Sequence, residues 1–67
     1  MTRKDYILIA AKFCLAKLDV LGKEPPEHHS DMLDGVYLAA EHIADALASD
    51  NPHFDRARFL AACGVQS

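Results

Sequence analysis

The residue types that most often bind metals are few in this sequence. His28 and His29 are adjacent, with Glu27 before them and Asp31 two positions later. Imidazole and carboxylate groups are common metal ligands, but adjacent histidines cannot easily both face one ion. No Cys-x-x-Cys or His-x-x-x-His spacing accompanies them. We therefore interpret the segment as a solvated polar loop and predict no metal site.

Cys14 and Cys63 are the candidate nucleophiles. A reactive thiolate needs an exposed position beside a histidine or another cation. Both cysteines fall on helix faces that we expect to be buried, where cysteine usually packs as a small apolar residue. We therefore predict no catalytic residue, no cofactor and no enzymatic activity.

Carboxylates are the most informative polar groups. Asp34, Glu41 and Asp45 lie at i, i+7 and i+11 and so share one stripe of a helix, with Asp31 close by. Leu38 falls among them, and an apolar anchor inside a charged rim is typical of a protein-binding hot spot. Such a stripe can also imitate a run of phosphates for a basic protein groove. The alternative interpretation is an ordinary solvated helix face.

Basic residues are too few for a convincing nucleic acid surface. Arg56 and Arg58 open the last predicted helix, and Arg3 and Lys4 lie near the N-terminus. Such residues on a second helix can reach phosphates or base edges, but the turn before them is long for a helix-turn-helix and the formal charge is −3. The sequence therefore argues against direct nucleic acid binding. We expect Arg56 and Arg58 to pair with Asp55 or with carboxylates of the second helix, as surface ion pairs worth little.

Capping signals and apolar periodicity predict three helices that position these groups, over residues 3–21, 31–49 and 55–63. No stretch alternates apolar and polar residues for long enough to predict a strand. Helices joined by short connections pack antiparallel or at a steep crossing. The predicted fold is a small all-α three-helix bundle, in a single helical domain over residues 1–67.

Residues with particular backbone preferences mark the helix ends. Thr2 is predicted to cap the first helix, with Asp5 three residues later completing a capping box, and Gly22 is predicted to end the helix. We expect residues 22–29, which include two prolines, to form an irregular loop. Ser30 or Asp31 would then cap the second helix.

The third helix has the clearest signals. With Asp55 as its N-cap, Phe54 and Phe59 have the spacing of a hydrophobic staple, and Gly64 supplies a left-handed stop. A start at Asn51, followed by a proline at the first helical position, is the alternative.

The first predicted helix is apolar on two sides. We interpret one side as its core face, formed by Ile7, Ala11, Cys14, Leu15 and Leu18. The second side is formed by Tyr6, Ile9, Phe13 and Val20. Either this helix is simply the centre of the bundle, or a partner or second subunit docks on Tyr6, Phe13 and Val20 and gives, for example, a homodimer.

The second predicted helix has a single core face, formed by Met32, Leu33, Val36, Ala40, Ile43 and Leu47. Gly35 lies inside this helix, where glycine costs about 1 kcal/mol relative to alanine. A close helix crossing at Gly35 would explain its presence.

Composition limits the class of protein. The chain has 67 residues, of which 51% are hydrophobic, so it is too apolar for a disordered chain. The apolar run over residues 6–11 is far too short to span a bilayer, and a signal peptide is not expected. Two cysteines fit reduced thiols better than a disulfide framework. We therefore expect a soluble cytoplasmic protein.

Two sets of segments stand out at the ends of the chain: Thr2-Arg3-Lys4-Asp5-Tyr6 with Ile9-Ala10, and Asp50-Asn51-Pro52 with Phe54-Asp55-Arg56-Ala57-Arg58-Phe59-Leu60 and Ala62-Cys63-Gly64. These segments resemble the ends of small proteins encoded by phages, prophages and other bacterial mobile elements. They cover about a third of the chain and are structural in character, so no functional residue is carried over from them. The resemblance implies a bacterial host and a protein that acts by binding a host protein. Anti-CRISPR proteins, several of which cover the DNA-binding surface of an interference complex, are one such class.

We therefore expect a non-enzymatic protein-binding inhibitor of a host defence complex. An anti-CRISPR protein that occludes a basic DNA-binding surface of a CRISPR effector is the most concrete form. Its partner-binding surface would consist of Asp31, Asp34, Leu38, Glu41 and Asp45. The alternatives are a small DNA-binding regulatory module and a homo-oligomeric structural or assembly protein.

Overall fold

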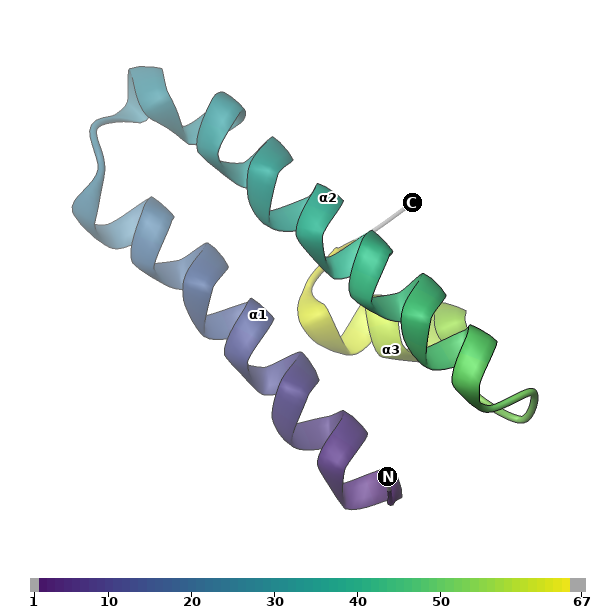
Figure 1. Cartoon of the computed structure of the whole chain (residues 1–67). Coiled ribbons are helices and arrows are strands. Elements are labelled where there is room, and N and C mark those ends of the chain that lie inside the picture. Colours follow the sequence, from purple (N-terminus) through teal and green to yellow (C-terminus); the bar gives the residue numbers. More distant parts are fainter. Residues whose placement is uncertain (1, 66–67) are drawn as a thin grey trace.

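The computed structural model describes residues 2–65, and three α-helices account for most of them (Figure 1). Helix α1 spans Arg3–Lys23, α2 spans Pro26–Asp50 and α3 spans Arg56–Cys63. The two long helices run antiparallel, and the short α3 packs against both (Figure 1). The predicted all-α three-helix bundle is confirmed, and the described part of the chain contains no strand. None of the helices described here combines the length and the apolar content that crossing a membrane requires.

Helix α1 begins with the predicted capping box. The Thr2 hydroxyl accepts a hydrogen bond from the Asp5 backbone N–H at 3.3 Å, and the Asp5 carboxylate accepts one from the Thr2 backbone N–H at 2.9 Å. This backbone hydrogen bond lowers the pKa of Asp5, because it favours the charged carboxylate. The predicted stop at Gly22 is wrong, since the helix continues to Lys23. It ends there because Glu24 precedes a proline and is extended, with φ −96° and ψ 149°.

Helix α2 begins at Pro26, earlier than the sequence predicts. The expected loop over residues 22–29 is therefore wrong, and neither predicted cap residue lies at the helix start. Only Glu24 and Pro25 connect the two long helices. Pro26 occupies the first helical position, where no N–H is needed and its fixed φ suits a helix. The second proline thus starts a helix, although in the sequence the pair looked like a helix breaker.

Helix α3 forms as predicted. The Asp55 carboxylate caps it by accepting a hydrogen bond from the Arg58 backbone N–H at 3.0 Å. The rings of Phe54 and Phe59 form the staple, with centroids 5.4 Å apart. Gly64 ends the helix in the left-handed conformation, with φ 84°, which glycine adopts without steric cost. An isolated helix of eight residues is not stable in water, so packing must hold α3 in place.

Small side chains on the long helices let α3 approach closely. Ala10 on α1 and Ala40 and Ala44 on α2 are buried, and the larger side chains of the core cluster come from α3 and from Val65, two residues after it. This core consists of Ala10, Ala40, Ala44, Phe59, Leu60, Cys63 and Val65. The close crossing predicted at Gly35 is wrong, because a Cβ placed there would have no neighbour within 4 Å.

The two apolar faces of α1 are exchanged relative to the prediction. Tyr6, Ile9 and Phe13 pack against the core, and Val20 is buried. The face predicted to be the core is largely exposed, including Ile7, Ala11, Leu15 and Leu18, while Cys14 is half-buried. The interpretation of Tyr6, Phe13 and Val20 as a partner surface is therefore wrong.

Aromatic packing accounts for the choice of face. The Tyr6 ring meets the Phe54 ring edge to face, with centroids 4.9 Å apart, an arrangement that stabilises aromatic pairs beyond their buried area. The Tyr6 hydroxyl also accepts a hydrogen bond from the Asn51 side-chain amide at 3.2 Å. The periodicity of α1 cannot reveal these partners, because they come from the connection between α2 and α3.

The core face of α2 is also rotated from the prediction. Ala40 is buried and Leu33, Val36 and Leu47 are half-buried, but Met32 and Ile43 are exposed. Tyr37 and Ala44 take part in the core instead. The inward face of α2 is therefore displaced toward the side on which α3 packs.

Candidate functional site

The acidic face of α2 stands on the surface as a continuous stripe. Asp31, Asp34, Glu41 and Asp45 are all exposed, and Leu38 among them is 57% exposed. Because α2 is one uninterrupted helix of 25 residues, the stripe from Asp31 to Asp45 extends about 21 Å at 1.5 Å per residue. The structure therefore places all five predicted partner-binding side chains on one accessible helix face.

One end of this stripe is anchored to α3. The Arg56 guanidinium donates a hydrogen bond from Nε to the Asp45 carboxylate at 2.8 Å, with both side chains well exposed. The expected pairing of Arg56 with a carboxylate of the second helix is confirmed. An exposed pair of this kind contributes at most about 1 kcal/mol to stability, but it directs the Arg56 charge toward the acidic stripe.

A groove of about 530 Å³ lies between the N-terminal part of α1, α3 and the connection before it. Arg3 and Arg58, which are 55 positions apart in the sequence, both line it. Its apolar lining includes Tyr6, Phe54 and Phe59. The sequence alone does not bring the two arginines together, because no spacing rule connects residues on different helices.

Polar groups of the connection give this groove a defined wall. The Asn51 side-chain carbonyl accepts a hydrogen bond from the His53 backbone N–H at 3.0 Å, while its amide donates to Tyr6. His53 and Asp55 also line the groove, and Asp55 is already engaged as the cap of α3. The groove therefore offers two guanidinium groups over an aromatic surface, an arrangement that suits weak anion binding.

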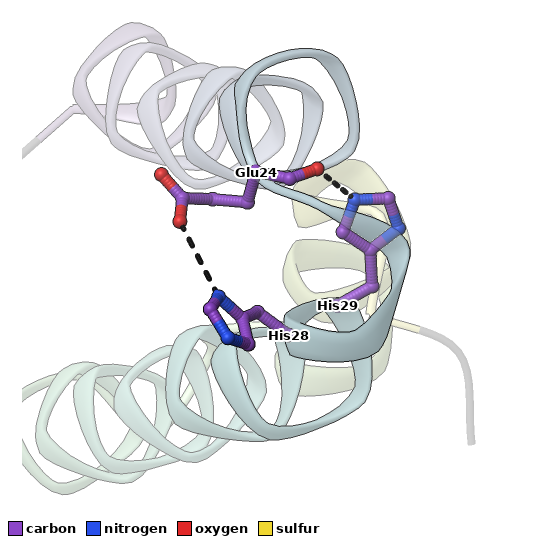
Figure 2. A network of polar contacts seen from close by, with 3 residues as sticks. All are labelled: Glu24, His28 and His29. Atoms are coloured by element: carbon purple, nitrogen blue, oxygen red, sulfur yellow. Dashed lines mark hydrogen bonds and ion pairs between the residues drawn. The ribbon is translucent and has the colours of Figure 1, made fainter.

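Glu24, His28 and His29 form a polar cluster at the turn between α1 and α2 (Figure 2). His29 Nε2 lies 2.7 Å from the Glu24 carbonyl oxygen, and since a carbonyl only accepts, Nε2 carries the proton. His28 Nδ1 lies 3.9 Å from the Glu24 carboxylate. The expected solvated loop is wrong, because both histidines belong to α2 and His29 is half-buried.

The geometry of this cluster gives it a structural role. Figure 2 shows the two imidazole rings directed at different atoms of Glu24, so their nitrogens do not converge on a common point. Across residues 2–65, no group of three or more His, Cys, Asp or Glu side chains is placed to hold a metal ion. The hydrogen bond from His29 instead ties the start of α2 to the residue that ends α1.

The two cysteines are free thiols at the contact between α1 and α3. Cys63 is fully buried and Cys14 is half-buried. Burial, with a smaller contribution from the charge of Cys14, raises the pKa of the Cys63 thiol to about 11. The Cys63 thiol therefore remains protonated near neutral pH, where a protonated thiol is a poor nucleophile.

Lys17 has a structural role that the sequence does not indicate. Its ammonium group donates a hydrogen bond to the Gly64 carbonyl at 3.0 Å, at the end of α3 where carbonyl groups lack helical partners. A cation near a helix C-terminus also interacts favourably with the helix dipole. In the sequence, Lys17 is one of several charged residues of α1, and nothing in its spacing identifies Gly64 as a partner.

No protein-family model matches this sequence, and comparisons with curated proteins and with solved structures found no significant match.

Proposed function

We propose that this protein is a non-enzymatic protein-binding inhibitor that docks on a basic surface of a host complex through the acidic face of α2. The observation that carries the proposal is the position of Leu38. Its side chain is 57% exposed and lies on one helix stripe among the exposed carboxylates of Asp31, Asp34, Glu41 and Asp45.

Each component of this face has a definite role in docking. Asp31, Asp34 and Glu41 meet lysine and arginine side chains of the target, which speeds association and makes it sensitive to salt. Leu38 enters an apolar pocket between those contacts, since hot spots lie at the desolvated centre of an interface. Asp45 already pairs with Arg56, so it contributes mainly to the rim.

The resemblance of both chain ends to small mobile-element proteins gives the proposal its biological setting. In its most specific form, the target is a CRISPR effector in a bacterial cytoplasm. The stripe of carboxylates, about 21 Å long, then occupies the basic channel that receives DNA. Inhibition follows from occlusion, and it requires no catalytic group and no cofactor.

The first experiment is affinity capture from a bacterial lysate treated with nuclease, over a range of salt concentrations, with mass spectrometry of the captured proteins. We expect a defence complex that survives nuclease and is released by salt. Recovery of nucleic acid alone in a parallel capture without nuclease would instead favour the DNA-binding alternative, with Arg3 and Arg58 of the basic groove as the contacting residues.

Affinity for the captured target then tests the face itself. The double charge reversal Asp34→Lys with Glu41→Lys should weaken binding more than tenfold, about 1.4 kcal/mol or more, with unchanged helicity by circular dichroism. Asp19→Lys with Asp50→Lys is the matched control, because it changes the net charge equally at exposed positions off the stripe. Equal affinities for the two variants would exclude this face from the mechanism.

A further inference from the structure

Helix α1 carries an apolar face that the rest of the described chain leaves open. Its large side chains, which are between 45% and 61% exposed, are Ile7, Leu8, Leu15, Leu18 and Leu21. The opposite side of the same helix is occupied, since Tyr6 and Phe13 pack against the core and Val20 is buried. One helix therefore has two apolar faces, of which the bundle covers one.

The exposed face has the spacing of a helix-packing seam. Leu8, Ala11, Leu15 and Leu18 follow one another at intervals of three, four and three residues, which is the heptad pattern that aligns side chains for a second helix. Ile7 and Leu21 border this seam and lie 14 positions apart, so they share one line along the helix. The face from Ile7 to Leu21 is about 21 Å long.

The molecule exposes more surface than its size requires. Its accessible surface is 4713 Å², whereas a compact monomer of 7.4 kDa exposes about 4,200 Å². Its radius of gyration is 12.4 Å, compared with about 10.9 Å for a compact chain of this length. Figure 1 shows the reason, because α3 is much shorter than α1 and α2 and leaves the ends of both long helices projecting beyond it.

We propose that this α1 face, formed by Ile7, Leu8, Ala11, Leu15, Leu18 and Leu21, pairs with the same face of a second copy of this chain. The excess surface is about 500 Å² per chain, so covering it in two copies buries about 1,000 Å² in total. An area of about 1,000 Å² is the lower limit for a specific protein interface. This inference concerns a different helix from the proposed host-binding face and does not depend on it.

The uncharged centre of the face suits contact with a second copy. A two-fold dimer places each residue of the patch against the same patch, and an uncharged seam brings no like charges into contact at its centre. Asp5, Lys12 and Asp19 are spaced by seven along one side of the face. Helix α1 as a whole carries five basic and two acidic residues, and because basic residues also suit an anionic membrane surface, vesicle binding is a separate outcome of the experiment.

Sedimentation equilibrium of the full chain, from about 1 to 200 μM, tests the proposal, since dimerisation depends on concentration. We expect a mass approaching twice 7.4 kDa and a melting temperature that rises with concentration. Leu15→Glu with Leu18→Glu should raise the dimer dissociation constant about 100-fold or more, because it places two charges in the buried seam. Met32→Glu with Leu38→Glu is the matched control, as it changes two exposed apolar side chains of α2.

The wild-type chain alone can overturn the proposal, whether or not the variants fold. A single-chain mass throughout the concentration range would do so. A dimer that persists in the Leu15→Glu, Leu18→Glu variant, or that the α2 control dissolves equally, would also exclude this face. A monomeric wild type that co-sediments with phospholipid vesicles would assign the face to lipid instead. If the Met32→Glu, Leu38→Glu variant still dimerises but no longer captures the host protein, dimerisation through α1 and host binding through α2 are independent.

Discussion

Replacing Ala40 by leucine tests whether close helix packing holds this small bundle together. The Ala40 side chain is 0% exposed and belongs to the core that all three helices share. Leucine adds three carbon atoms at a position with no access to solvent. Overpacking of a well-packed core typically costs about 1 to 3 kcal/mol. A chain of 67 residues has a total stability of about 3 to 10 kcal/mol, so this one change removes a large part of it.

Ala39→Leu provides the matched control. Ala39 is exposed and lies about 100° around the same helix, and the change in helix propensity is the same at both positions. Urea unfolding followed by circular dichroism should show a loss of about 1 to 3 kcal/mol for Ala40→Leu and less than about 0.5 kcal/mol for Ala39→Leu. Equal stabilities of the two variants would refute the placement of Ala40 in the core.

Two further predictions follow from the helix caps and the buried thiol. Asp55→Ala should lower the free energy of unfolding by about 1 kcal/mol, or the melting temperature by about 4 to 8 °C, whereas Asp55→Asn, which can still cap α3, should retain most of the stability. Burial raises the pKa of Cys63 to about 11 from the ordinary value of 9.0, so its contribution to stability is complete below pH 9 and is lost as the pH rises toward 11. Urea unfolding should show that the free energy of unfolding falls by about 2 kcal/mol over that interval. Cys63→Ala should remove this part of the pH dependence. The same dependence of stability on pH in that variant would contradict its assignment to Cys63.

Local signals in the sequence were sufficient to predict both ends of α3 and the start of α1. A capping residue and a left-handed glycine act through hydrogen bonds and backbone preferences within a few residues. Asp55, Gly64 and the Thr2 capping box therefore behave as their positions predict. The connection between α1 and α2 was not predicted, because Pro26 is compatible both with a loop and with the first turn of a helix.

The candidate docking face was predicted for a similar reason. Asp31, Asp34, Leu38, Glu41 and Asp45 share a stripe because of helical periodicity alone, and their exposure follows once the opposite side of α2 meets the bundle. The basic groove was not predictable in this way. Arg3 and Arg58 come together only because α3 packs beside the N-terminal part of α1.

The sequence by itself determined that the chain forms three helices, where two of them begin, and which side of α2 carries the carboxylates. Only the tertiary structure decided which apolar face of α1 is buried. Both faces have helical periodicity and large apolar side chains, so burying either one gains a similar hydrophobic free energy. The pairing of Tyr6 with Phe54 and Asn51 and the reach of Lys17 to Gly64 favour one face. These contacts join residues at least 45 positions apart, and they exist only after α3 has packed against α1.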